Sequence, residues 1–188
     1  MKRLRVILIL GLFLVAGTAF FLWREEKLEQ QFFPQIKAAA ERYGVDPQLV
    51  RAIAWRESRF HPEVRGRAGE LGLMQIQEVA AQEWADAEHV GGFVHEHCLD
   101  PGTNTMAATF YLSKLLKRYT KQTDNPVPFA LADYNAGRAN AMKWKTAPNS
   151  ATNSEVFIRQ IGFPSTKAYV KSVMRRYRLY KFLDQLGL

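Results

Sequence analysis

The sequence predicts a mainly helical domain preceded by one amino-terminal transmembrane helix, and three observations lead to this fold class. An uncharged and mostly apolar run of 18 residues extends from Val6 to Trp23. Aspartate–proline pairs at 46–47 and 100–101 are typical of helix starts. No alternating run of β-branched residues is long enough for a sizeable sheet, and the sequence has no repeat of 20 to 50 residues.

Composition narrows the class of protein. Of the 188 residues, 47% are hydrophobic and 23% are charged, which is the balance of a globular protein with a core. Cys98 is the single cysteine, so an internal disulfide framework and a cysteine-built zinc finger are excluded. The net charge of +8 comes from the two ends of the chain, and the body between them is balanced. DNA-binding domains concentrate charge on one face, so no nucleic acid is expected as a partner.

The apolar run from Val6 to Trp23 would reach roughly 27 Å as a helix, close to the thickness of a bilayer core. Lys2, Arg3 and Arg5 precede it, which favours a cytoplasmic amino terminus and a single pass. A cleaved signal peptide is the alternative, with a cleavage site at residues 17–19. The run continues beyond that site and is longer than a usual signal core, so an uncleaved anchor over residues 1–23 is favoured.

Residues 24–34 are charged and are expected to form a juxtamembrane spacer, and residues 35–188 form the predicted domain. Turn signals divide this domain into helices. An alanine-rich helix over 36–43 stops at Gly44, and a helix over 126–136 is closed by Gly137. Further helices follow the two aspartate–proline pairs. After a polar loop over 149–154, a last helix carries an apolar and aromatic stripe at Val170, Val173, Tyr177 and Tyr180.

One carboxylate lies on the apolar face of a predicted helix. Positions 50, 53, 54 and 57 share a stripe, and three of them are apolar while the fourth is Glu57. Burial and a position near the helix end both raise the pKa of a carboxyl group, and a carboxylic acid that stays protonated near neutral pH can act as a general acid. The alternative is a glutamate that reaches solvent or pairs with a nearby arginine.

Motifs downstream of Glu57 bear on this choice. Glu57-Ser58-Arg59-Phe60 is followed by Ala68-Gly69, by Gly72-Leu73-Met74-Gln75-Ile76, by Ala132-Asp133-Tyr134-Asn135-Ala136-Gly137, and by Phe163-Pro164 leading to Tyr169-Val170. This order resembles the soluble lytic transglycosylases, a lysozyme-like family related to goose-type lysozyme that cleaves peptidoglycan. The resemblance covers roughly residues 35 to 183.

The resemblance implies a lysozyme-like fold and a mechanism with one carboxylic acid. Glu57 would protonate the β-1,4 bond between N-acetylmuramic acid and N-acetylglucosamine, assisted by the substrate's 2-acetamido group. The resulting carboxylate would take the proton of the muramyl 6-hydroxyl, which closes a 1,6-anhydro ring. No cofactor and no metal are implied.

The resemblance also implies site residues, whereas the expected location follows from the predicted anchor. The expected substrate-binding residues are Ser58, Met74, Gln75, Tyr134, Asn135 and Tyr169, with Tyr169 hydrogen-bonding near Glu57. Structural alternatives remain: Ser58 as a helix-end hydrogen bonder, Met74 as core, and Tyr134 as a core aromatic. The expected partners are peptidoglycan glycan strands and the inner membrane, with the catalytic domain periplasmic.

Some residues depart from the family pattern. Gly66 stands where the family often has a serine, Gly69-Glu70 replaces Gly-Ala, and Ser165-Thr166-Lys167 replaces Glu-Thr-Arg. Two other functions therefore stay open, a hydrolytic muramidase and a wall-binding scaffold.

Asp133 is expected on a solvated face. His89, His95 and His97 match no zinc spacing and are expected in a plain loop.

Overall fold

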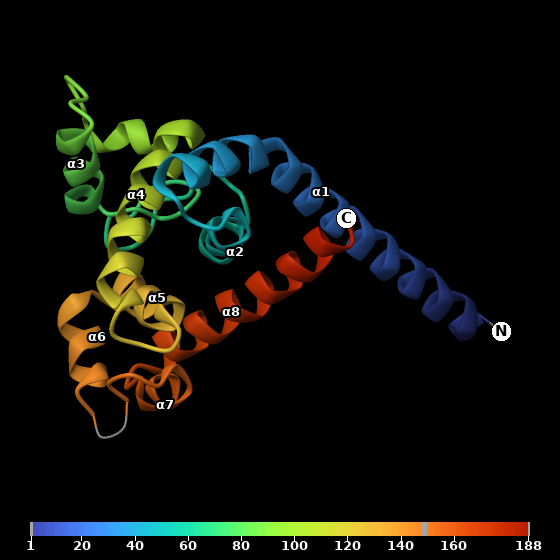
Figure 1. Cartoon of the computed structure of the whole chain (residues 1–188). Coiled ribbons are helices and arrows are strands. Elements are labelled where there is room, and N and C mark those ends of the chain that lie inside the picture. Colours follow the sequence, from blue (N-terminus) through green and yellow to red (C-terminus); the bar gives the residue numbers. More distant parts are fainter. Residues whose placement is uncertain (1, 148–149, 188) are drawn as a thin grey trace.

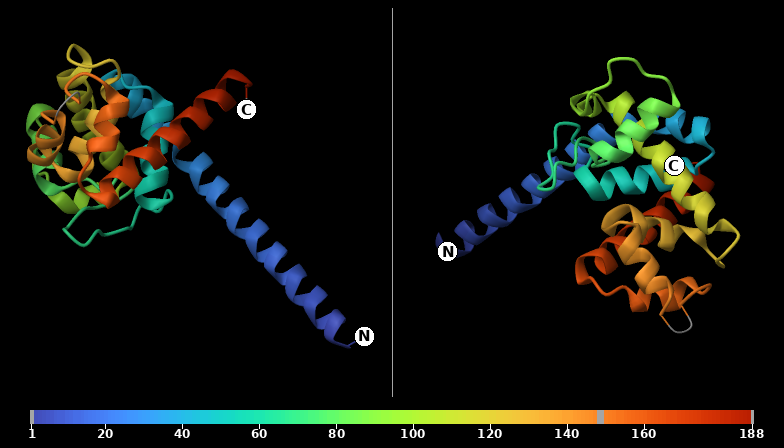
Figure 2. Two further views of the ribbon diagram at one scale, coloured as in Figure 1. Left: turned by 90° about the horizontal axis from the view of Figure 1, so that it is seen from below. Right: turned by 90° about the vertical axis from the view of Figure 1, so that its left-hand side faces the viewer.

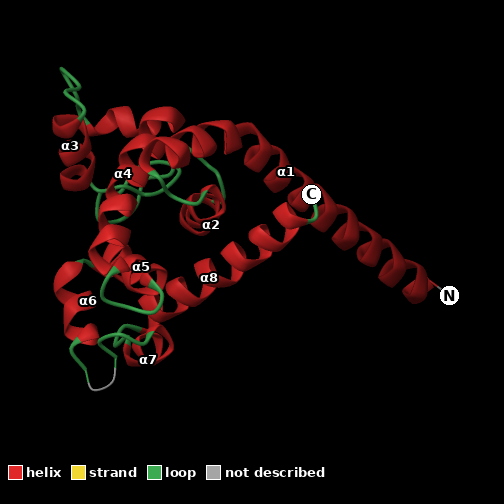
Figure 3. Cartoon of the chain, viewed as in Figure 1, coloured by secondary structure: helices red, strands yellow, loops and turns green. Residues whose placement is uncertain are grey.

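The computed structural model describes residues 2–147 and 150–187, and within them the chain is helical (Figures 1 and 3). The elements in chain order are α1 (Lys2–Tyr43), α2 (Pro47–Ser58), α3 (Glu78–Ala87), the 3₁₀ helix η1 (His95–Leu99), α4 (Pro101–Thr120), α5 (Pro126–Ala136), α6 (Arg138–Lys145), α7 (Ser154–Gln160) and α8 (Pro164–Gln185). Strand pairing in the described part is limited to two isolated bridges, Arg65 with Leu71 and Leu71 with Ile76. The mainly helical prediction is confirmed.

Helix α1 has two parts. Its amino-terminal part projects away from the body in every view, and its carboxyl-terminal part packs against α4 and α2 (Figures 1 and 2). The predicted spacer over 24–34 is helical and continuous with both neighbouring segments, even through Pro34. Among the described residues, no helix contains a stretch that is both apolar enough and long enough to cross a membrane. The structure therefore does not support the predicted transmembrane helix.

The helix starts predicted from the two aspartate–proline pairs are confirmed. Asp46 Oδ1 accepts a hydrogen bond from the backbone N–H of Gln48 at 2.9 Å, at the start of α2. Asp100 Oδ1 accepts from the backbone N–H of Thr103 at 2.8 Å, at the start of α4. In both helices proline follows the cap, where its missing N–H costs nothing. Each such cap stabilises its helix by about 1 kcal/mol.

The core lies around α4, which packs against α1, α3 and α5, while α8 lies across α2 and α5 (Figure 1). In α8 the predicted stripe turns inward, since Val170, Val173 and Tyr180 are buried. Tyr177 is half-buried and its hydroxyl donates to Asp46 Oδ2 at 2.8 Å. The last helix therefore fixes the start of α2, the helix that carries Glu57.

Candidate active site

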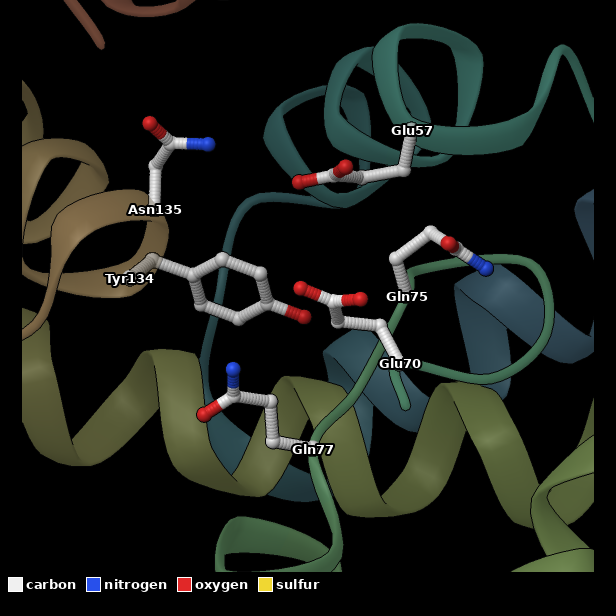
Figure 4. Close-up of a pocket in the computed structure, with 6 residues that line it drawn as sticks. All are labelled: Glu57, Glu70, Gln75, Gln77, Tyr134 and Asn135. Carbon is white, nitrogen blue, oxygen red and sulfur yellow. The ribbon is translucent and has the colours of Figure 1, made fainter. Parts of the chain in front are cut away.

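Glu57 lies in the last turn of α2, which ends at Ser58 because Arg59 adopts a left-handed backbone with φ of 53°. Its half-buried side chain points into a pocket of about 180 Å³ (Figure 4). The lining residues come from α2, from the loop between α2 and α3, and from α5, and they are Glu57, Glu70, Gln75, Gln77, Tyr134 and Asn135. The pocket therefore has polar walls and a carboxylic acid at one side.

Burial raises the pKa of Glu57 to about 7. The nearby Tyr169 hydroxyl and the positive charge of Arg56 lower this pKa, and the negative charge of Glu70 raises it further. Near neutral pH the Glu57 carboxyl is therefore divided between its protonated and ionised forms. This is the condition that a group acting in turn as acid and base requires.

Tyr169 approaches Glu57 from α8. Its hydroxyl is buried and, among the described residues, meets no partner with full hydrogen-bond geometry, although it is close enough to the carboxyl to lower the pKa of Glu57. Burial in turn raises the pKa of Tyr169 well above its ordinary value, so the hydroxyl stays neutral. The Arg56 guanidinium lies 5.5 Å from the Tyr169 ring. Tyr169 thus lies close to the acid without lining the pocket.

The side chain of Asn104 on α4 fixes the loop over residues 71–76 through hydrogen bonds to backbone groups. The buried Asn104 side chain donates to Leu71 O at 2.8 Å and to Cys98 O at 2.7 Å, and it accepts from Met74 N–H at 2.8 Å. Gly72 has φ of 77°, and a Cβ there would lie 2.2 Å from Asn104 Nδ2. Only glycine at position 72 allows the close approach of the Asn104 side chain that fixes this loop.

Gln75 and Tyr134 have polar atoms that are committed within the protein. Gln75 adopts φ of 49°, and its Nε2 donates to Val64 O and to Gly72 O, each at 2.9 Å. The Tyr134 hydroxyl donates to Met74 O at 2.8 Å. The hydrogens of both groups are therefore used within the protein, and each group can only accept a further hydrogen bond.

Asn135 completes the side of the pocket formed by α5. Its Oδ1 accepts a hydrogen bond from the Thr166 hydroxyl of α8 at 2.8 Å. This contact leaves its Nδ2 directed toward the pocket as a donor (Figure 4). The structure thus brings Glu57, Gln75, Tyr134 and Asn135 together around one pocket.

Besides Tyr169, two other predicted substrate-binding side chains, those of Ser58 and Met74, do not line this pocket. Ser58 is buried, and its hydroxyl donates to Leu73 O at 2.8 Å and to Ala54 O at 3.3 Å. This contact ties the end of α2 to the loop that carries Gln75. Met74 is fully buried in the core, and its backbone carbonyl supports Tyr134. The structure thus gives Ser58 and Met74 the structural roles that the sequence left open as alternatives.

Glu70 and Gln77 line the pocket without having been predicted. Periodicity offers no signal for either residue, because both lie in the irregular loop between α2 and α3. The available signal for Glu70 was its departure from the family pattern, four residues after the departure at Gly66.

Asp133 corrects an expectation. It is buried rather than solvated, and its Oδ2 accepts from Arg118 Nη1 at 2.7 Å and from the Tyr119 hydroxyl at 2.8 Å. The ion pair joins α5 to α4 next to Tyr134. The solvated position was wrong because the partners of Asp133 come from another helix and cannot be read from the local pattern.

The histidines lie outside the pocket lining. His95 Nε2 is 3.0 Å from Ile76 O, and the His97 ring packs edge-on against Phe93. Among the residues described, no group of three or more histidine, cysteine, aspartate or glutamate side chains is arranged to hold a metal ion.

A helical domain with one protonatable glutamate in a polar pocket has the features of an acid–base enzyme. Residues 34–157 match the family described as the Transglycosylase SLT domain, and the chain belongs to this family.

Known proteins resemble the chain over most of its length. The soluble lytic murein transglycosylase of Escherichia coli K12 is 28% identical over 166 residues, covering 86% of this chain and 25% of that protein. The membrane-bound lytic murein transglycosylase F of Desulfosudis oleivorans is 35% identical over 109 residues, covering 57% of this chain and 22% of that protein. The chain therefore spans about a quarter of the length of these relatives.

Solved structures confirm the fold. The crystal structure of the 70-kDa soluble lytic transglycosylase from Escherichia coli superposes with a TM-score of 0.72 at 29% identity. The superposition covers 89% of this chain and 27% of that one.

Proposed function

We propose that this protein is a peptidoglycan lytic transglycosylase. It cleaves the β-1,4 bond between N-acetylmuramic acid and N-acetylglucosamine and leaves 1,6-anhydromuramic ends. The observation that carries the proposal is Glu57, whose pKa burial raises to about 7 in a pocket lined by polar side chains. Membership of the family and the names of the relatives support the choice of substrate.

Glu57 acts twice in the proposed reaction. Its proton passes to the glycosidic oxygen, the C1–O bond breaks, and the N-acetylglucosamine residue leaves with a free 4-hydroxyl. The Glu57 carboxylate then removes the proton of the muramyl 6-hydroxyl, and that oxygen bonds to C1. No water is consumed, and Glu57 returns to its protonated form. Tyr169 and Arg56 stabilise the ionised carboxylate between the two steps.

A hydrolytic muramidase is the second candidate, and Glu70 favours it. Glycosidases that use water usually have two carboxylates, and Glu70 lines the same pocket as Glu57. The two functions give different ends. Hydrolysis leaves reducing muramic ends that borohydride converts, whereas the 1,6-anhydro end is lighter by one water and does not react.

Digestion of purified sacculi tests the proposal. The wild-type chain is expected to release soluble muropeptides, and Glu57→Gln is expected to release none above background. Glu63→Gln, which makes the same change of charge at an exposed position of the following loop, serves as the control. Wild-type release by Glu57→Gln would show that the acid is another residue.

We also propose that the amino-terminal part of α1 associates with the inner membrane and leaves the domain on the periplasmic side. Nine large apolar side chains between Ile9 and Trp23 are more than half exposed, far more apolar surface than a soluble helix usually presents. Lys2, Arg3 and Arg5 precede them. After cell fractionation the chain should sediment with membranes and resist alkaline extraction. A soluble product that begins near Phe20 would instead show cleavage.

A further inference from the structure

Glu70 occupies space that a side chain at position 66 would fill. A Cβ on Gly66 would lie 2.1 Å from Glu70 Oε2 and 2.8 Å from Gln75 Oε1. The same Glu70 Oε2 accepts a hydrogen bond from the backbone N–H of Ala68 at 3.0 Å, which fixes the carboxylate over the loop. The Glu70 carboxylate can therefore take this position only because residue 66 has no side chain.

The Glu70 carboxylate is one of several hydrogen-bond acceptors among the residues that line the pocket. Gln75 and Tyr134 can only accept hydrogen bonds from a ligand, because their own hydrogens are donated to backbone carbonyls. Glu70 adds a second carboxylate oxygen, since only one of the two is engaged by Ala68. Glu70, Gln75 and Tyr134 line the same pocket as Glu57 (Figure 4). A ligand that hydrogen-bonds to these three side chains must offer them N–H or O–H groups.

Charge distinguishes Glu70 from the other acceptors. Glu70 forms no ion pair with the described basic side chains, and it lies close enough to Glu57 to raise the pKa of that residue. The remaining groups that act on Glu57 are Arg56 on its own helix and Tyr169 on α8. A negative charge on the pocket wall opposes ionisation of the acid and attracts the positive charge that develops on a sugar ring when its glycosidic bond breaks.

We propose that Glu70 is a second functional carboxylate of this site, which accepts a hydrogen bond from an N–H or O–H group of the bound glycan and places its negative charge beside the bond that Glu57 cleaves. The inference rests on the glycan-cleaving function proposed above. It assigns Glu70 to binding and electrostatic stabilisation, and it leaves proton transfer to Glu57.

The test compares Glu70→Gln with Glu63→Gln in the full chain. Glutamine keeps the size of Glu70 and an oxygen for Ala68, and it removes only the charge. Loss of a charge-assisted hydrogen bond should lower kcat/KM for soluble glycan strands about 10- to 100-fold. The descending limb of kcat/KM at high pH should also move to lower pH, because Glu57 loses the neighbour that raises its pKa. Glu63→Gln should change neither quantity.

A binding measurement makes the test independent of turnover. In the Glu57→Gln background, a tetrasaccharide of alternating N-acetylglucosamine and N-acetylmuramic acid is titrated by calorimetry. Adding Glu70→Gln should raise its Kd about tenfold or more. Gly66→Ala should act in the same direction, because the new Cβ displaces a carboxylate that is still present in the chain. Unchanged thermal unfolding of each variant would exclude misfolding.

Two results would overturn the inference. The first would be that Glu70→Gln and Gly66→Ala have the same kinetics and the same glycan affinity as Glu63→Gln. The other is a wild-type enzyme whose reducing muramic ends disappear in Glu70→Gln, which would make Glu70 the base that activates water. A wild-type chain that cleaves no glycan would instead refute the proposed function, and the tetrasaccharide titration would still decide the role of Glu70.

Discussion

Replacing Glu57 by glutamine should abolish activity and at the same time stabilise the folded protein. The pKa of this carboxyl is about 7 in the folded chain against an ordinary value of 4.5. At pH 7 about half of the molecules therefore carry the acidic proton, compared with about 0.3% for an unshifted glutamate. Glutamine keeps the shape and has no proton to deliver. The loss of acid–base help should reduce the rate by about 10² to 10⁴ or more, because Glu57 serves both steps.

The stability effect follows from the same pKa. The folded state binds the Glu57 proton more tightly than the unfolded chain does, so this contribution to stability is complete below about pH 4.5 and is lost as the pH rises through about 7. At pH 8 the ionised carboxylate should destabilise the wild type by on the order of 2 kcal/mol relative to glutamine, after allowance for the solvent that reaches it.

Thermal unfolding at two pH values measures this effect. Glu57→Gln should have a Tm about 4–8 °C above the wild type at pH 8 and a nearly equal Tm at pH 4.5. Glu63→Gln, with the same change of charge at an exposed position, should show no such dependence on pH. A Glu57→Gln variant that is no more stable than the wild type at pH 8, or that retains turnover, would refute the assignment of Glu57 as an acid whose pKa is raised by burial.

Three further substitutions test how the site is supported. Asn104→Ala removes three hydrogen bonds to backbone groups and should lower the free energy of unfolding by about 3 kcal/mol in urea titrations, with loss of activity. Gly72→Ala should destabilise the protein far more than Gly69→Ala, because both glycines have positive φ but only a Cβ at Gly72 meets other atoms, and equal urea midpoints would contradict this. Asp133→Ala should cost about 3 kcal/mol by leaving Arg118 without its buried partner, and a neutral effect on the Tm would show that the ion pair contributes nothing.

Local chemistry explains which parts of the fold the sequence predicts. Asp46 and Asp100 cap helices whichever way the rest of the chain folds, so their helices can be read from neighbouring residues alone. Glu57 is predictable for a similar reason, because an apolar stripe on one helix defines the inward direction. Gly44 and Gly137 likewise mark the ends of α1 and α5.

Contacts between distant segments explain what the sequence does not predict. Asp133 is buried because Arg118 and Tyr119 of α4 reach it, and no pattern within α5 records those partners. Glu70 enters the pocket because Gly66 leaves space for it, and that space exists only in the folded loop. Residues 24–34 resemble a spacer in composition, yet they continue α1 as a helix toward the part that packs on α4.

In the proposed reaction Glu57 drives cleavage without the addition of water, and digestion of sacculi in ¹⁸O-labelled water shows whether water is added. The muramyl 6-hydroxyl is tethered to the reacting carbon, and such positioning can be worth roughly 10⁵ M or more in effective concentration, against about 55 M for free water. The expected products have 1,6-anhydromuramic ends that contain no ¹⁸O and resist borohydride. Reducing muramic ends that carry ¹⁸O as the main product would contradict it and would identify the enzyme as a muramidase.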